Sequence, residues 1–198
     1  MSASARDLKI SLRRQLRAEM ARHPAAERVA LSARLCDLLR QQAQWQQARA
    51  VLFFVPRLDE PDVLPLLAEF LGRGGLAVLP AFSESSSTYE LRAVGDTSAD
   101  LVPGRHGIPQ PGPWCASVAA NRLDLVLVPG VGFDLAGRRL GRGQGVFDRL
   151  LADVSAWKCG VAFDWQVVAE LPVEPHDVLL NSILTPSRWH GVAGHGRS

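Results

Sequence analysis

Glycine and arginine, two residue types well suited to holding phosphate groups, are concentrated between residues 137 and 149 of this chain. The glycines are Gly137, Gly141, Gly143 and Gly145, and the arginines among them are Arg138, Arg139 and Arg142. Glycine permits positive φ and close backbone approach, so consecutive N–H groups can point at one anion. Arginine matches phosphate oxygens with paired donors. In a strand-to-helix context, this composition predicts a polyphosphate site rather than a turn-rich surface loop with solvated arginines.

Two familiar phosphate-binding motifs do not fit this segment. No Gly-Lys-Ser/Thr follows the glycines, so the segment is not a Walker A loop. Gly141-x-Gly143 begins like the dinucleotide fingerprint, and Asp164 lies about 20 residues beyond it, where a ribose-binding acid would be. Val146, however, occupies the position of the third glycine that this fingerprint needs. We therefore do not expect NAD binding.

Charged residues at three places in the sequence can each be interpreted in two ways. Asp148 lies at the start of a predicted helix. A carboxylate there can bind a Mg²⁺ ion that also binds nucleotide phosphates, or it can only interact favourably with the helix dipole. Lys9, Arg13 and Arg17 recur every four residues on the first predicted helix, as a solvated face or as donors to the same phosphates. Glu60 follows a buried strand, at the carboxyl end where open α/β sheets bind ligands, but can equally be structural. The histidines have no metal-ligand spacing, and no Gly-x-Ser-x-Gly motif is present.

The hydrophobic pattern alternates between apolar runs typical of strands and helical spacing. It predicts helices over residues 6–21, 24–47, 61–71 and 147–154, and strands over residues 50–55, 76–79, 88–93, 123–128, 157–163 and 179–184. The Gly- and Pro-rich residues 95–122 are expected to form a long loop, and the polar residues 187–198 a poorly ordered tail. Alternating βα units predict an α/β fold, with one domain over residues 1–198 and a mostly parallel sheet flanked by helices.

Composition limits the function classes further. The chain has 198 residues, 47% of them hydrophobic, and a net charge of +2, so nothing indicates nucleic acid or an anionic membrane as a partner. The three cysteines are odd in number and widely spaced, which argues against a disulfide framework or a zinc site and favours a reducing compartment. The first residues lack a signal-peptide core, and the longest apolar runs are too short to span a bilayer. We expect a cytoplasmic protein.

Five segments, in order along the chain, carry a resemblance to one family. They are Lys9-x-x-x-Arg13, Glu60-Pro-Asp62, Gly107-Ile-Pro-Gln-Pro111, the block Pro129–Asp134 with Gly137–Arg149, and the ending with Gln166, Leu171-Pro172, Glu174, Asp177 and Thr185. This pattern resembles the 5-formyltetrahydrofolate cyclo-ligases. The resemblance implies a single three-layer α/β domain, acting as a monomer. It also implies ATP-dependent cyclisation of 5-formyltetrahydrofolate to 5,10-methenyltetrahydrofolate, with release of ADP and phosphate.

The same resemblance implies roles for individual residues. Those implied in ATP binding are Lys9, Ile10, Ser11, Leu12, Arg13, Arg139, Leu140, Gly141, Arg142, Gly143, Gln144, Gly145, Val146 and Phe147. Those implied in folate binding are Val55, Glu60, Arg142, Gly143, Gln144, Gly145, Val146 and Phe147. Lys9, Arg139 and Glu60 are implied to be catalytic, and Asp148 and Asp177 to hold Mg²⁺.

One departure from the family pattern concerns the folate side. Val146 and Phe147 stand where the family usually has two tyrosines. Phe147 can still stack on a flat pteridine but lacks the hydroxyl, and Val146 removes a ring. We expect retained chemistry with altered folate affinity. The alternatives are a catalytically weakened relative that binds nucleotide or folate as a regulatory module, and an enzyme of sugar-phosphate or CoA-ester chemistry on a similar fold.

Overall fold

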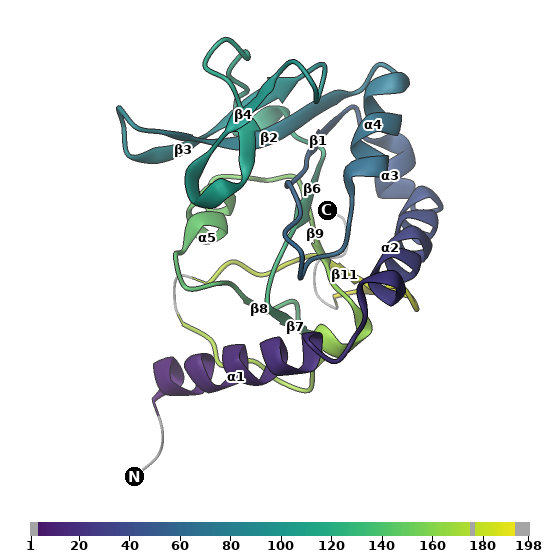
Figure 1. The fold of residues 1–198 in the computed structure, drawn as a ribbon, viewed down its shortest axis with the longest axis vertical. Coiled ribbons are helices and arrows are strands. Elements are labelled where there is room, and N and C mark those ends of the chain that lie inside the picture. The colour runs from purple at the N-terminus through teal and green to yellow at the C-terminus, as the bar shows by residue number, and fades with distance from the viewer. Residues whose placement is uncertain (1–3, 175–176, 193–198) are drawn as a thin grey trace.

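A seven-stranded sheet organises the chain, of which the computed structural model describes residues 4–174 and 177–192 (Figure 1). In spatial order the strands are β12 (Trp189–Gly191), β11 (Ser182–Leu184), β9 (Trp157–Val161), β6 (Leu125–Val128), β1 (Ala50–Leu52), β2 (Leu76–Ser83) and β3 (Thr88–Val94). The five inner strands are parallel, and the two edge strands pair antiparallel. This confirms the predicted α/β class with a mostly parallel sheet.

Alternate residues of the central strands supply two separate cores. Val51 and Leu125 point to one face, Leu52 and Val126 to the other, and all four are fully buried. A parallel sheet covered on both faces therefore has continuous apolar strands, as the sequence has here. The helices α2 (Ala25–Arg40), α3 (Ala43–Gln47) and α4 (Leu64–Gly72) cover the first face, and α5 (Val146–Leu151) covers the second.

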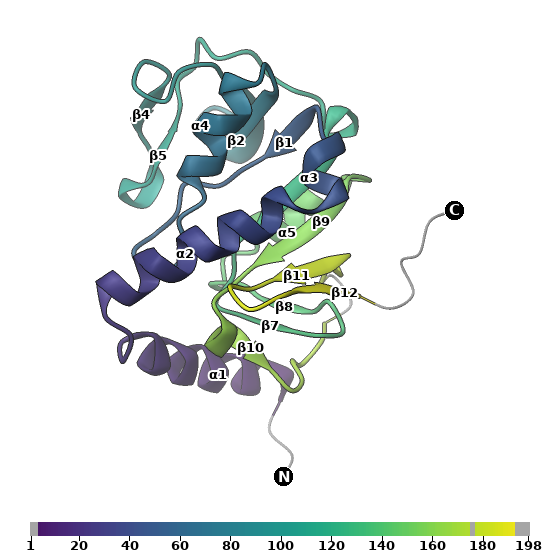
Figure 2. The same cartoon turned by 90° about the vertical axis from the view of Figure 1, so that its right-hand side faces the viewer.

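The first helix, α1 (Ala5–Met20), lies apart from these layers, against a small second sheet (Figure 2). Ser4 caps it by accepting a hydrogen bond from the Asp7 amide at 3.2 Å. Its buried Leu16 packs against Val131 and Leu140. The small sheet has the order β10 (Val167–Val168), β7 (Gly132–Asp134), β8 (Arg139–Leu140). This packing brings α1 beside the glycine-rich segment.

From the sequence, one loop carrying Gly137, Gly141, Gly143 and Gly145 is expected to lead into the helix, but its first part, residues 137–140, belongs to a hairpin, so that expectation was wrong. β7 and β8 pair antiparallel, and the Asp134 carboxylate closes their turn by accepting from the Ala136 and Arg138 amides, each at 3.0 Å. Gly137 has a φ of +83° in this turn, which a side chain would strain. The loop that leads into α5 is therefore limited to Gly141–Gly145, and we call this segment the glycine loop.

Proline-containing segments account for two further corrections. The strand expected to end at Pro80 continues to Ser83. Proline has no N–H to donate to a neighbouring strand, but β1 pairs with β2 only as far as Val78, so no donor is needed at Pro80 on that side. The expected long loop contains the antiparallel pair β4 (Leu101–Pro103) and β5 (Pro109–Pro111), with the 3-10 turns η1 (Arg105–Gly107) and η2 (Ala120–Arg122).

The remaining differences concern element ends. The helix expected over 24–47 divides into α2 and α3 around Gln41 and Gln42, and the first strand ends at Leu52 rather than Val55. In the tail, Trp189–Gly191 forms β12, and the partly buried Trp189 packs on the first core. The expected disorder was therefore wrong for residues 187–192, while 193–198 lie outside the described residues. Among the described helices, none combines the length and hydropathy needed to cross a membrane.

Candidate active site

A cleft lies beyond the carboxyl ends of β1 and β6, where open α/β sheets bind ligands. Five parts of the chain build its walls: the residues that follow β1, the residues that follow β6, β8, the glycine loop with α5, and a side formed by β2, β3 and residues 105–110. Its lining includes Phe54, Val55, Arg57, Glu60, Pro80, Tyr89, Arg105, Ile108, Pro109, Gln110, Pro129, Gly130, Arg139, Gly141, Arg142, Gln144, Gly145, Val146, Phe147 and Asp148.

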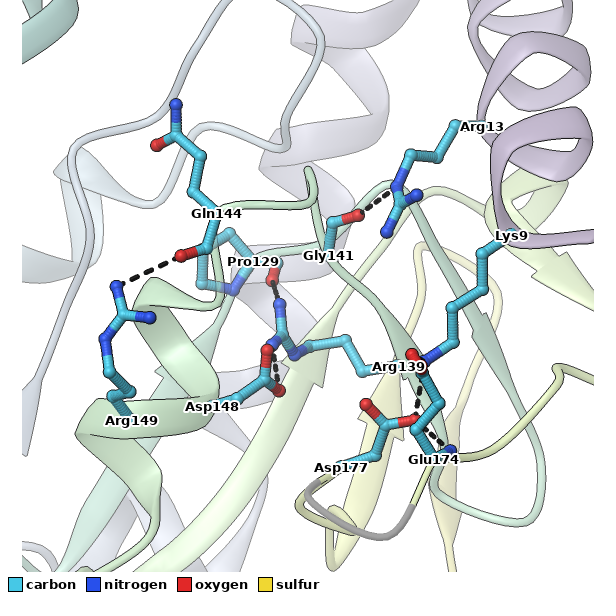
Figure 3. Close-up of polar contacts among 10 residues, drawn as sticks. All are labelled: Lys9, Arg13, Pro129, Arg139, Gly141, Gln144, Asp148, Arg149, Glu174 and Asp177. Atoms are coloured by element: carbon cyan, nitrogen blue, oxygen red, sulfur yellow. Dashed lines mark hydrogen bonds and ion pairs between the residues drawn. The ribbon is translucent and has the colours of Figure 1, made fainter. Parts of the chain in front are cut away.

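Arg139 is a fixed positive charge in the wall of this cleft (Figure 3). Its Nη2 donates to Oδ1 of Asp148 at 2.6 Å and its Nη1 donates to the Pro129 carbonyl at 3.4 Å. The guanidinium carbon lies 5.9 Å from the centre of the Phe147 ring. Nε is buried and has no hydrogen-bond partner among the described residues. The residue is therefore held by β8, β6 and α5 at once, with one donor unused.

Arg142 joins the glycine loop to the segment that follows β1. Its Nη2 lies 2.6 Å from Oδ1 of Asp59 and 2.9 Å from Oε1 of Glu60. The other oxygen of Glu60 accepts from the Arg57 amide at 2.9 Å. Burial alone would lower the pKa of Arg142 and raise that of Asp59, but their mutual attraction more than offsets burial in both, so both groups are charged. This cluster forms one side of the cleft.

Lys9 and Arg13 lie on the buried side of α1, whereas Arg17 is exposed. The Lys9 ammonium is 2.7 Å from Glu174 and 2.7 Å from Asp177. Burial lowers the pKa of Lys9, but hydrogen bonds to Asp177 and Glu174 raise it by more, so the pKa lies above its ordinary value. Lys9 thus ties α1 to the chain segment after β10 (Figure 3).

Arg13 reaches the glycine loop itself. Its Nε donates to the Gly141 carbonyl at 2.7 Å, and a Cβ atom at Gly143 would lie 3.7 Å from its guanidinium carbon. Burial, followed by repulsion from Arg17, lowers the pKa of Arg13 from its ordinary value. Of the two basic residues on the buried side of α1, it is therefore Arg13 that lies next to the loop predicted to hold phosphates.

Ten of the residues implied by the family pattern line the cleft together: Val55, Glu60, Arg139, Gly141, Arg142, Gln144, Gly145, Val146, Phe147 and Asp148. The others lie elsewhere. Ile10 and Ser11 are exposed on α1, and Leu12 and Leu140 pack between α1 and the small sheet. Arg138, expected among the phosphate donors, instead pairs with Asp134 and with Glu170, at 3.5 and 2.9 Å.

The two carboxylates implied to hold Mg²⁺ belong to different ion pairs, Asp148 with Arg139 and Asp177 with Lys9. Within residues 4–174 and 177–192, no cluster of three or more His, Cys, Asp or Glu side chains could hold a metal by itself. Mg²⁺ in nucleotide sites is usually held by one or two carboxylates together with the phosphates. Asp148, which lines the cleft, fits that donor set.

The wall of the cleft formed by β3 and the turns around β5 was not predicted from the sequence. Tyr89, Arg105, Ile108 and Gln110 line the cleft from this side. The Gln110 side-chain amide exchanges two hydrogen bonds with the Phe82 backbone, at 3.0 and 3.2 Å, and so fixes β5 beside β2. The motif at residues 107–111 was a signal for this wall, and Tyr89 is the single tyrosine of the chain.

Comparison with known proteins decides the family. The model of the 5-formyltetrahydrofolate cyclo-ligase family matches residues 5–186. The chain belongs to this family. It is 34% identical to the 5-formyltetrahydrofolate cyclo-ligase of Mycolicibacterium smegmatis over 145 residues, which covers 71% of this chain and 75% of the relative. It is 27% identical to the mouse 5-formyltetrahydrofolate cyclo-ligase over 195 residues, covering 93% of this chain and 94% of that protein.

The fold agrees with solved structures. The NMR structure of the Aquifex aeolicus 5,10-methenyltetrahydrofolate synthetase superposes with a TM-score of 0.85 at 31% identity, covering 96% of this chain and 95% of that chain. The synthetase from Mycoplasma pneumoniae superposes with a TM-score of 0.69 at 23% identity, which supports the fold alone. The resemblance deduced from the motifs and the predicted fold class are both confirmed.

Proposed function

We propose that this chain catalyses the ATP-dependent cyclisation of 5-formyltetrahydrofolate to 5,10-methenyltetrahydrofolate, with release of ADP and phosphate. Its membership of the family is one support. The observation that carries the proposal is that one cleft combines a buried carboxylate, Glu60, and flat apolar walls with an arginine-lined glycine loop. Such a cleft has the groups needed to bind a pteridine and a polyphosphate next to each other.

The folate side of the proposed site is built around Glu60. Glu60 is 8% exposed, and its carboxylate is an acceptor placed where a pteridine could present N–H donors. Phe147 and Tyr89 supply aromatic faces and Val55 an apolar one, which suit a flat ring. Arg142, already bonded to Glu60, holds that carboxylate in its orientation. We assign Glu60 as the residue that orients the ring in the reaction.

The ATP side is assigned to the glycine loop, with Arg13 and Arg139 flanking it. Gly143 and Gly145 have φ values of +100° and +61°, so the loop has a backbone course that other residues rarely adopt, and these two positions carry no side chain. Arg139 contributes a buried charge and an unused Nε donor, and Arg13 a second guanidinium next to the loop. Lys9, in this proposal, holds α1 so that Arg13 stays in place.

The proposed chemistry needs no acid or base of special strength. The formyl oxygen attacks the γ-phosphorus of ATP, the bond to the bridging oxygen breaks, and ADP leaves. N10 then attacks the activated formyl carbon to form the new C–N bond, gives up its proton, and phosphate departs with the former formyl oxygen. The chain's task is to align the two substrates and to stabilise charge developing on the phosphoryl oxygens, which Arg139 and Arg13 would do. Mg²⁺ bound with ATP would supply further charge neutralisation, held by Asp148 and, as the second proposed ligand, Asp177.

We further propose that residues 1–198 act as a single catalytic domain and as a monomer, because the residues assigned to both substrates come from one chain. A reducing, cytoplasmic location is favoured by Cys36, Cys115 and Cys159, which are buried and unpaired in the structure. Light scattering on the purified protein measures the mass in solution. A dimer that persists on dilution would contradict the monomer.

The test of the proposed sites compares Arg139→Ala and Asp148→Asn with Arg138→Ala. The first two should raise the KM for ATP by about 10- to 100-fold, the loss expected for one charge-assisted hydrogen bond. Arg138→Ala, on the same hairpin but directed at Asp134 and Glu170, should leave the KM for ATP unchanged. An unchanged KM for ATP in both of the first two variants would disprove the phosphate-site assignment. Tight binding of folate or ATP by the wild type without turnover would favour the regulatory module instead.

A further inference from the structure

A second hollow adjoins the cleft on the side away from Glu60. Tyr89, Arg105, Gln144 and Val146 line both spaces, so they form the junction between them. Ser87, Thr88 and Arg149 line the second hollow but not the cleft, and Glu60 lines only the cleft. A ligand long enough to pass the junction would therefore have one end near Glu60 and the other in the second hollow.

The second hollow is rich in hydrogen-bond donors and cationic. Arg105 lies over the Phe82 ring, with its guanidinium carbon 4.3 Å from the ring centre. Arg149 reaches back from α5 so that its Nη2 donates to the Gln144 carbonyl at 3.0 Å (Figure 3). Ser87 and Thr88, at the beginning of β3, also line this space. No Asp or Glu of the described chain is among the residues that line this space.

Arg105 and Arg149 differ in charge balance from the other arginines of the site. Arg139 is paired with Asp148, and Arg142 with two carboxylates. Within the described residues, neither Arg105 nor Arg149 lies within ion-pair distance of a carboxylate. Each guanidinium contacts a neutral group, and neither forms an ion pair with a carboxylate of the chain. Two such groups favour binding of a carboxylate anion, whose two oxygens can accept paired hydrogen bonds.

We propose that Arg105 and Arg149 form a subsite for the carboxylates of the substrate's glutamate end. This inference rests on the proposed function, because 5-formyltetrahydrofolate has a flat ring at one end and a glutamate at the other, joined by an aminobenzoyl group. With the ring at Glu60 and Phe147, the aminobenzoyl group would cross the junction beside Val146, which is smaller than the tyrosine usual in the family. The glutamate, and any further γ-linked glutamates, then occupy the second hollow. A phosphate group of ATP is the competing occupant.

The experiment measures steady-state kinetics of Arg105→Gln, Arg149→Gln and the double variant. Arg122→Gln is the matched control, because it removes an exposed arginine at the opposite, amino-terminal end of β6. Substrates are 5-formyltetrahydrofolate, its form with several γ-linked glutamates, and the 5-formyltetrahydropteroate that lacks glutamate. The double variant should raise the KM for the glutamate-bearing substrates by about tenfold or more, since it loses charge-assisted hydrogen bonds. The kcat and the KM for ATP should not change, and the kinetics with the glutamate-free compound should equal those of the wild type.

Added salt gives a second readout, because screening should remove most of the difference between wild type and the double variant. A KM for folate that is unchanged in the double variant, or an increase confined to the KM for ATP, would overturn the subsite. If the wild type shows no turnover, the proposed function fails, but equilibrium binding still decides the subsite. Weaker binding of 5-formyltetrahydrofolate by the double variant, without weaker binding of the glutamate-free compound, supports the subsite; equal binding overturns it. Circular dichroism melts of each variant verify folding.

Discussion

Replacing Lys9 by methionine, which keeps most of the side-chain length, isolates the charge that ties α1 to the rest of the molecule. The ammonium has two ion-pair partners at 2.7 Å, and the side chain is 8% exposed. In Lys9→Met the two carboxylates lose their common cation and remain close to one another. Because α1 also carries Arg13 to the glycine loop, looser packing of the helix should in addition raise the KM for ATP.

The size of the effect depends on how far solvent screens each partner. Removing one member of a buried ion pair costs about 3–5 kcal/mol, but exposed pairs contribute about 1 kcal/mol or less. The Asp177 side chain is 14% exposed and that of Glu174 is 37% exposed, so the cluster lies between these cases. We expect a loss of about 2–3 kcal/mol in unfolding free energy, or roughly 4–12 °C in Tm for a chain of this length.

The assay is urea unfolding followed by tryptophan fluorescence, for wild type, Lys9→Met and the control Arg14→Met. Arg14 is an exposed residue of the same helix. Since the folded pKa of Lys9 is raised above 10.5, its contribution is complete below that pH and is lost as the pH rises through the folded value. The difference between wild type and Lys9→Met should therefore shrink in alkali. Equal stabilities of Lys9→Met and Arg14→Met at pH 7 would show that the ion pairs of Lys9 do not stabilise the fold.

Three further predictions concern other residues. Asp59→Asn should be less stable than wild type by an amount that is constant above pH 3.8, the ordinary carboxyl pKa. The difference should shrink as the pH falls through the lowered pKa of Asp59 and protonates it, and acid-unfolding curves measure it. Burial raises the pKa of Cys36 to about 11 and that of Cys159 to about 12, so iodoacetamide at pH 8 should label them only in urea, as mass spectrometry would detect. Gly145→Ala should cost about 1–2 kcal/mol in urea unfolding, because φ is +61° there.

The parts of the fold that could be predicted are those with a local cause. Leu125–Val128 is fully buried on both faces, and an apolar run of that kind is visible without knowing its neighbours. The β7–β8 hairpin was missed because its strands have only three and two residues, although Asp134 and Gly137 are typical turn residues. A short strand has no periodicity long enough to distinguish it from a loop.

Residues of the site were predictable by type but not by direction. Arg138 and Arg139 look equivalent in the sequence, yet Arg138 precedes β8 and pairs with Asp134 and Glu170, whereas Arg139, the first residue of β8, lines the cleft. The partners of Lys9 lie 165 and 168 residues away along the chain, and no local pattern announces them. Tyr89 and Arg105 reach the cleft only because β3 folds back on β2, and this tertiary arrangement is not visible in the local sequence.

The central claim is that one cleft couples ATP hydrolysis to closure of the folate ring. The most direct measurement mixes purified protein with ATP, Mg²⁺ and 5-formyltetrahydrofolate, and follows the absorbance of the methenyl product together with the release of ADP. We expect equal amounts of methenyltetrahydrofolate and ADP, and neither product when the other substrate is omitted. No methenyl product at high enzyme concentration, or product formed without ATP, would contradict it.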